Sequence, residues 1–123
     1  MVYVDFWSTT CGPCLEEFRH YTKPLKDQYQ SKDVVFLYIC GGQYLRHQYM
    51  WREQIKKYNI EGYHLYLEFD QYDELYRLLA NDKNIAISMP HYFILDKTGK
   101  VVNTDAKRPS DRDSLFAQLN TFL

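Results

Sequence analysis

The sequence lacks the features that mark several specialised classes of protein. Its longest strongly apolar run, Val34–Cys40, is far shorter than the ~20 residues that a membrane-spanning helix needs. Neither sign of charge dominates, since 15 basic and 16 acidic side chains leave a net charge of −1. That balance argues against a general binder of nucleic acid or of anionic membranes, which would carry a basic excess. Three cysteines are too few for a disulfide-scaffolded miniprotein.

Repeats, linkers and low-complexity stretches are also absent, so the 123 residues predict a single domain over 1–123. Apolar residues make up 46% of the chain, which is enough for a sizeable core. The first residues show no basic segment of a signal peptide and are typical of the beginning of a strand. We therefore expect that an upstream segment is missing.

What the sequence does contain is an alternation of strand and helix patterns. Val2–Trp7 and Val34–Cys40 are short runs of β-branched and aromatic residues, typical of buried strands. Between them, apolar residues recur at helical spacing over Cys11–Gln30, and Pro24 is expected to kink this helix. The strand–helix–strand unit predicts a parallel pair with a right-handed crossover.

The rest of the chain predicts a second helix, an insertion at about residues 60–85, a hairpin and a final helix. The predicted elements are a second strand ended by Gly41-Gly42, a helix over Gln43–Tyr58, an extended piece over Tyr63–Leu67, a helix over Asp70–Leu79, strands over Tyr92–Leu95 and Lys100–Asn103, and a helix that begins with a Ser110/Asp113 capping box. Leu45, Tyr49 and Leu78 are expected to face inward, and Asp70 is an expected N-cap. Together these elements predict an α/β fold with a mixed sheet of about four main strands and helices on both faces.

The Cys11-Gly12-Pro13-Cys14 motif is the strongest chemical signal, because it follows a predicted buried strand and opens a helix. At a helix N-terminus, unpaired N–H groups and the macrodipole favour the thiolate of Cys11. Cys14 lies about one turn further on, within reach of Cys11. Pro13 is tolerated in the first turn, and Gly12 leaves the approach to Cys11 open. We expect Cys11 to attack a substrate disulfide and Cys14 to resolve the mixed disulfide.

Two other interpretations of the cysteine pair are open. The pair could be half of a zinc site completed by Cys40 and a histidine, although the second paired motif of such a site is missing. The candidate histidines are His20, His47, His64 and His91. The pair could also be an isolated structural disulfide, although so short a loop gains little from closure. Cys40 itself is expected to be a small hydrophobic core residue.

Val2–Trp7 followed by the Cys11–Cys14 motif resembles the thioredoxin superfamily. Further stretches are similar to its TlpA/ResA-like branch, the extracytoplasmic thiol–disulfide oxidoreductases, and the last of them, Ala106–Ser110, resembles versions found in Bacteroides-like bacteria. These stretches are Glu17-Phe18, Trp51, Gly62–Leu65, Met89-Pro90, Ile94–Lys100 and Ala106–Ser110. The resemblance covers almost the whole chain and implies a thioredoxin-like three-layer α/β/α fold.

The resemblance also implies roles for residues around the motif. Asp5 matches a buried aspartate that relays protons for the second cysteine, and burial is expected to raise its pKa. Glu17 matches a glutamate near the disulfide, with an exposed helix position as the alternative. Pro90 matches the family's cis-proline, beside which the backbone of Met89 would pair with an extended substrate. Trp7 is expected to pack beside the motif.

Three features depart from the family pattern. Thr10 stands where a tryptophan usually precedes the first cysteine, so the substrate-facing surface has no large ring there. Arg19 stands where the branch usually has a proline, so the helix kink is expected to move to Pro24. The strand or hairpin that usually precedes Val2 is absent.

The motif thus predicts a thiol–disulfide oxidoreductase that reduces or isomerises protein disulfides, and the resemblance implies that these proteins are periplasmic or otherwise extracytoplasmic. Gly12-Pro13 between the cysteines resembles reducing members more than oxidising ones. No cofactor or metal is expected, because Cys11 and Cys14 carry the electrons. The expected partners are protein disulfides and an upstream, membrane-bound thiol reductant, with no nucleic acid, and the domain is expected to be a monomer. The alternatives are a thiol oxidant and a non-catalytic peptide-binding module with the same fold.

Overall fold

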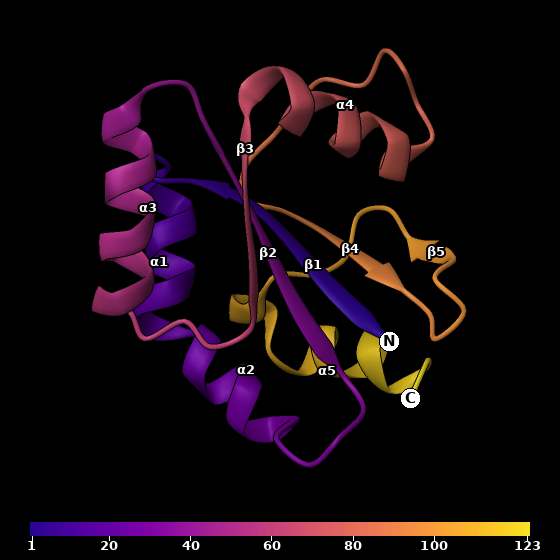
Figure 1. Cartoon of the computed structure of the whole chain (residues 1–123). Coiled ribbons are helices and arrows are strands. Elements are labelled where there is room, and N and C mark those ends of the chain that lie inside the picture. The colour runs from indigo at the N-terminus through magenta and orange to yellow at the C-terminus, as the bar shows by residue number, and fades with distance from the viewer.

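The computed structural model describes residues 1–123 and contains a five-stranded mixed sheet flanked by helices (Figure 1). The strands are β1 (Val2–Ser8), β2 (Val35–Gly42), β3 (Tyr63–Glu68), β4 (His91–Leu95) and β5 (Val101–Asn103). The helices are α1 (Gly12–His20), α2 (Thr22–Gln28), α3 (Leu45–Lys57), α4 (Phe69–Ala80) and α5 (Asp113–Asn120), with a 3-10 turn, η1 (Pro109–Asp111). β1 pairs in parallel with β2 and antiparallel with β4, so the predicted α/β fold with a mixed sheet is confirmed.

The sheet has one strand more than the sequence predicts. Its order is β3-β2-β1-β4-β5, and the extended piece of the insertion forms the edge strand β3, parallel to β2. Successive side chains of a strand point to opposite faces of the sheet, so this short segment can contribute to the core on both faces. Tyr66 packs against the core on one face and Leu67 against the core on the other.

The same alternation along β1 divides the interior into two cores. Tyr3 and Trp7 point to the face that α1, α2, α3 and α5 cover, and this face is called the thiol face below. Val4 and Phe6 point to the opposite face, which α4 and the loop before β4 cover and which is called the α4 face. Figure 1 shows α4 on one side of the strands and the α1–α3 pair on the other. Asp5 lies between Tyr3 and Trp7 in this alternation and therefore belongs to the thiol face.

The first predicted helix is in fact two helices, and the predicted position of its kink is wrong. α1 ends at His20 and α2 begins at Thr22, so the break lies at Tyr21. A proline ring clashes with the carbonyl group four residues earlier, and its nitrogen cannot donate a hydrogen bond there. For Pro24 that residue is His20, the last residue of α1. Pro24 itself lies in the first turn of α2, where proline is tolerated.

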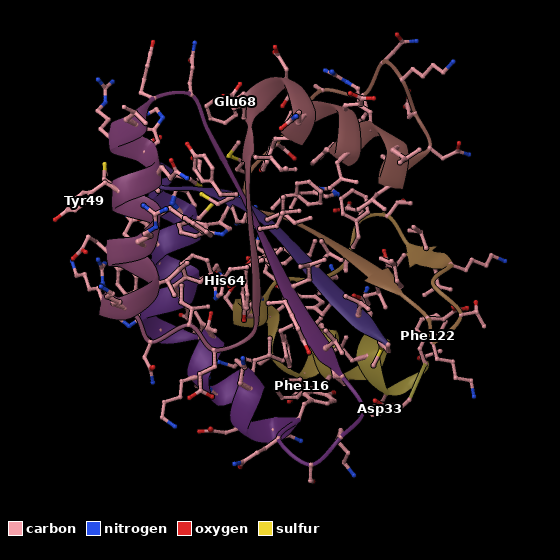
Figure 2. All side chains as sticks on the ribbon, viewed as in Figure 1. Asp33, Tyr49, His64, Glu68, Phe116 and Phe122 are labelled. Carbon is pink, nitrogen blue, oxygen red and sulfur yellow. A yellow bond between two sulfur atoms is a disulfide. The ribbon has the colours of Figure 1, made fainter.

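The predicted inward faces of the two middle helices are partly wrong. Leu45 and Tyr49 are 86% and 64% exposed, and Tyr49 points away from the molecule in Figure 2. α3 instead packs Trp51 against the core. In α4, Leu78 is 73% exposed, whereas the Tyr76 ring is buried with its hydroxyl 3.2 Å from the Ser88 hydroxyl. The rings of Tyr72 and Tyr76 fill the centre of this inward face, and Leu75 and Leu79 pack beside them.

Gly41 and Gly42 do not end β2 as predicted but complete it, opposite Leu67 and Glu68 of β3. An added Cβ at Gly41 would lie 2.8 Å from the ring of Tyr72. The strand therefore runs this close to the α4 rings only because the position has no side chain.

The predicted starts of α4 and α5 are also wrong. Residue Glu68, not Asp70, stands at the N-cap of α4, so Asp70 lies within the first turn. The Ser110/Asp113 capping box does not form, because Ser110 lies in η1 and α5 begins at Asp113. None of the helices combines the length and the apolar character that crossing a membrane requires.

Candidate redox site

Cys11 and Cys14 lie where β1 ends and α1 begins, as the sequence predicts. Cys11 is the N-cap of α1, and its Sγ accepts a hydrogen bond from the backbone N–H of Cys14 at 3.2 Å. The two cysteines form a disulfide, drawn as a yellow bond in Figure 2, with their Cα atoms 5.3 Å apart. The helix N-terminus that stabilises negative charge thus faces the sulfur of Cys11.

The two sulfur-bearing residues differ in accessibility. Cys14 is only 1% exposed and belongs to the core of the thiol face, whereas Cys11 is partly exposed. Thr10, Gly12 and Pro13 are all exposed, and no atom lies within 4 Å of an added Cβ at Gly12. A bulky reagent can therefore approach Cys11 across an open surface, while Cys14 is reached only from within the protein.

A side chain that sequence reasoning missed holds the loop before Cys11. Gln54 of α3 donates a hydrogen bond from Nε2 to the Thr9 carbonyl oxygen at 3.0 Å. The Cys11 N–H donates to the Ser8 carbonyl oxygen at 3.2 Å, which closes a tight turn between β1 and α1. No sequence motif predicts that this glutamine holds the loop, because the contact depends on how α3 packs beside the β1–α1 turn.

Asp5 is buried on the thiol face, 3% exposed, in register with Tyr38 of β2 and Tyr92 of β4. Burial raises the pKa of this carboxyl well above its usual range, and the nearby Glu17 carboxylate raises the pKa further. Its Oδ1 has no hydrogen-bond partner among the protein groups. Asp5 is therefore a buried acid whose proton affinity is set by its surroundings rather than by a salt bridge.

Glu17 is buried as well, at 6% exposure, so the alternative of an exposed helix position is wrong. Its Oε1 accepts a hydrogen bond from the backbone N–H of Ser110 at 2.9 Å. This contact joins α1 to η1 across 93 residues of sequence. The Ser110 N–H, expected to lie at a helix cap, is used here to satisfy a buried carboxylate.

The Met89–Pro90 peptide bond is cis, the isomer that the sequence predicts. Pro90 is buried and Met89 is partly buried against both cores. Trp7 was expected to pack beside the motif and does so from the interior: it is 0% exposed and packs edge-to-face on Phe18 of α1 at 4.8 Å between ring centroids. Trp7 therefore packs against α1 from the protein interior and is not part of the exposed surface around Cys11.

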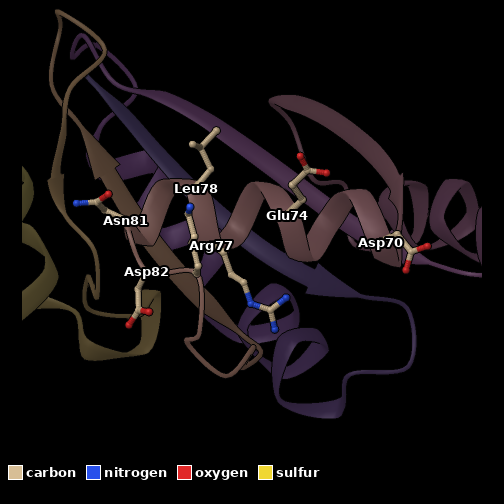
Figure 3. Close-up of a pocket in the computed structure, with 7 residues that line it drawn as sticks. Asp70, Glu74, Arg77, Leu78, Asn81 and Asp82 are labelled. Atoms are coloured by element: carbon tan, nitrogen blue, oxygen red, sulfur yellow. The ribbon is translucent and has the colours of Figure 1, made fainter.

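Cys40 is a free, buried cysteine, and burial raises the pKa of its thiol. No group of three or more histidine, cysteine, aspartate or glutamate side chains is arranged to hold a metal ion. The surface pocket drawn in Figure 3 lies along α4 and is lined by residues such as Asp70, Glu74 and Arg77. None of the predicted site residues lines that pocket.

Comparison with known proteins places this site in a family. Residues 1–119 match the family model described as Redoxin. The chain is similar to a candidate thiol–disulfide oxidoreductase from Bacteroides vulgatus, at 25% identity and a TM-score of 0.71, over 98% of this chain and 70% of that chain. No protein with a curated description matches the sequence.

Two further solved structures share the fold. One is the thioredoxin domain of a thiol–disulfide oxidoreductase from Bacteroides vulgatus, at 20% identity and a TM-score of 0.74, over 98% of this chain and 77% of that chain. The other is a candidate thiol:disulfide interchange protein DsbE from Chlorobium tepidum, at 23% identity and a TM-score of 0.74, also over 98% and 77%. The chain therefore belongs to the Redoxin family, and its Cys11–Cys14 pair at the start of α1 makes it a thioredoxin-like thiol–disulfide oxidoreductase.

Proposed function

We propose that the protein reduces disulfides of other proteins outside the cytoplasm and is itself re-reduced by a dithiol donor. The observation that carries the proposal is the asymmetry of the cysteine pair, with a partly exposed Cys11 at a helix N-terminus and a buried Cys14 behind it. An accessible, stabilised thiolate is what attack on a foreign disulfide needs, and a sheltered thiol is what prompt resolution needs.

The reaction transfers two electrons from the reduced pair to the substrate. The Cys11 thiolate attacks one sulfur of the substrate disulfide, a Cys11–substrate bond forms, and the other substrate sulfur leaves as a thiolate. Cys14 then loses its proton and attacks the Cys11 sulfur, which releases the second substrate thiol and leaves the Cys11–Cys14 disulfide. That oxidised pair is the state found in the structure. A dithiol donor restores the reduced pair by the same exchange in reverse.

We assign the acceptance of the Cys14 proton to Asp5. Its raised pKa supports this role, because a general base works best when its pKa lies near the working pH. Glu17 acts on the same step through Asp5, since its carboxylate raises the pKa of Asp5. The backbone of Met89, next to Pro90, is assigned to pair with an extended segment of the substrate. Domain 1–123 is proposed to act as a monomer, which light scattering would test.

The proposed location outside the cytoplasm and the proposed membrane-bound electron donor rest on the resemblance of the sequence to the TlpA/ResA-like branch. A membrane-impermeant thiol reagent tests the location directly. Added to intact cells that express the protein, it should label Cys11 after mild reduction. Labelling only after the cells are opened would contradict an extracytoplasmic position.

The proposed activity is tested by insulin reduction with dithiothreitol as the electron source. The wild-type protein should accelerate the reaction, Cys11→Ser should abolish it, and Cys14→Ser should accumulate a mixed disulfide with insulin. The equilibrium potential of the pair then gives the direction. A value near the ~−270 mV of thioredoxin supports a reductase, whereas a value near the ~−120 mV of DsbA would make the protein an oxidant. No exchange at all would favour the peptide-binding module.

A further inference from the structure

A chain of polar contacts surrounds the segment Ser88–Pro90, called the docking segment below. The hydroxyl of Ser88 lies 3.2 Å from the hydroxyl of Tyr76 in α4 and 3.5 Å from Nδ1 of His91 in β4. On its other side, Nε2 of His91 lies 2.7 Å from the carbonyl oxygen of Thr104, just after β5. The contact between Ser88, the first residue of the docking segment, and His91, the residue after its last, thus brings the two ends of the segment together.

The ring of His91 is held in place by packing as well as by these contacts. Its centroid lies 4.9 Å from that of Tyr76 and 4.8 Å from that of Phe93. The side chain of His91 is 11% exposed. The only carboxylate paired with it is Asp105, whose Oδ1 lies 3.9 Å from Nδ1 and whose side chain is 88% exposed. An exposed ion pair at that distance contributes little to stability. The position of the His91 ring is therefore fixed mainly by its contacts with Ser88 and Thr104.

Hydrogen-bond chemistry gives the chain a direction. A carbonyl oxygen only accepts, so Nε2 of His91 donates its proton to Thr104. In the neutral ring Nδ1 then has a free lone pair and accepts the hydroxyl proton of Ser88. The Ser88 oxygen in turn accepts the hydroxyl proton of Tyr76, which would otherwise be a buried donor without a partner. Each donor is used once, and the docking segment is tied to α4 at one end and to the end of β5 at the other.

The sheet register brings this chain to the redox site. β4 runs antiparallel to β1, and His91 pairs with Phe6. The residues before β4 therefore lie at the same end of the sheet as the residues after β1, which lead through Ser8 to Cys11. A substrate that pairs with Met89 is consequently oriented by whatever fixes the docking segment.

We infer that His91 is a positioning residue that, through Ser88, fixes the docking segment for protein substrates. This inference rests on the proposed function and adds to it the residues that set how a substrate is held. Neither side chain touches the sulfurs in this structure, so small disulfides that do not occupy the docking segment should react independently of them.

The test compares two substrates in the reduced protein: insulin, and bis(2-hydroxyethyl) disulfide as a small disulfide. His91→Phe retains the ring between Tyr76 and Phe93 but removes both nitrogens. We expect the KM for insulin to rise about 3- to 10-fold with kcat unchanged, the range of one or two lost hydrogen bonds. The rate with the small disulfide and the redox potential should stay at their wild-type values.

A second pair of variants keeps the inference testable if His91→Phe folds poorly. Ser88 is exposed, so Ser88→Ala should fold and raise the KM for insulin about 2- to 5-fold. Ser88→Thr retains the hydroxyl and should restore the wild-type KM. Ser114→Ala, at an exposed serine of α5, is the matched control and should change neither rate.

Two results would overturn the inference. One is a wild-type KM for insulin in both His91→Phe and Ser88→Ala; the other is an equal loss of rate with both substrates, which would mark a general structural role. A wild-type protein that reduces neither substrate would instead contradict the proposed function, so the two failures are distinguishable.

Discussion

The two faces of the central sheet are both covered by helices but differ in chemistry. The α4 face is built from Val4, Phe6, Ile39, Phe93 and two tyrosines of α4. The thiol face also packs aromatic rings, but among them lie two buried carboxyl groups and all three cysteines, of which Cys14 and Cys40 are buried and Cys11 is partly buried. Because successive residues of β1 alternate between the faces, one strand supplies Phe6 to the first and Asp5 to the second. The core of the α4 face is therefore apolar and aromatic, whereas the thiol face also buries the ionisable side chains of Asp5 and Glu17.

The largest expected effect lies on the α4 face and concerns stability. Phe6 is 0% exposed, and its ring packs edge-to-face on Tyr72, Tyr76 and Phe93 at 5.1 to 5.5 Å. Phe6→Ala should lower the free energy of unfolding by about 3–5 kcal/mol, because it removes this packing and leaves a cavity. Urea denaturation measures the loss. The milder Phe6→Leu should leave the redox potential unchanged, and a shifted potential would mean that the two faces are coupled.

On the thiol face, Asp5→Asn should affect chemistry more than stability. The variant removes the proposed proton acceptor, so attack of Cys14 on the mixed disulfide should slow by about 10²-fold at neutral pH. Stopped-flow measurement of insulin-thiol release from the mixed disulfide follows this step. Asp33→Asn, at an exposed loop position, is the control and should react like the wild type.

The same variant should change how stability depends on pH. Because the pKa of Asp5 is higher in the folded protein than in the unfolded chain, the folded state binds more protons between those two values. The stability of the wild type must therefore fall as the pH rises from about 4 through this window. Asp5→Asn should lack that fall and be the more stable protein at neutral pH. Parallel pH profiles for the two proteins would contradict a raised pKa at Asp5.

A smaller effect is expected at the junction between α3 and the thiol face. Gln54→Met retains the length of the side chain but removes the hydrogen bond to the Thr9 carbonyl oxygen. The free energy of unfolding should fall by about 1 kcal/mol, the usual net value of one such bond. The rate at which iodoacetamide alkylates Cys11 should change by about 2- to 5-fold, since the preceding loop is loosened. Gln71→Met, exposed on α4, should change neither quantity.

The site was largely predictable from sequence where its residues are neighbours in the chain. Val2–Trp7 followed by Cys11–Cys14 correctly predicts the strand, the turn and a helix that starts near Cys11, because local spacing determines all three. The contacts of Gln54 and His91 were not predictable in this way. They depend on where α3 and β5 pack, which no spacing in one segment specifies. His91 was a candidate zinc ligand in the sequence, whereas the structure places it in a chain of hydrogen bonds.

The fold shows the same division between local and distant determinants. The β4–β5 hairpin follows from its own loop, where Oδ1 of Asp96 accepts hydrogen bonds from the N–H groups of Thr98 and Lys100. The position of the helix break depended on how Pro24 acts on the turn before it. The inward face of α4 depends on which of its side chains pack against the sheet. Leu78 was predicted to face inward but is exposed. Whether Glu17 is buried depended on η1, whose backbone N–H at Ser110 supplies its partner.

The smallest expected effect concerns the negative charge of Glu17 on the thiol face. Glu17→Gln retains an oxygen that accepts the Ser110 N–H, but it removes the negative charge that raises the pKa of Asp5. The pKa of Asp5 in the folded protein should fall towards its usual value. The pH range over which stability declines should therefore end at a lower pH than in the wild type. The pH profile of mixed-disulfide resolution should move to lower pH for the same reason. Glu16→Gln is the matched control, because Glu16 precedes Glu17 in the same helix and its side chain is 54% exposed. An equal shift in both variants would mean that Asp5 responds to the overall charge of α1. It would contradict a specific effect of the Glu17 carboxylate on the pKa of Asp5.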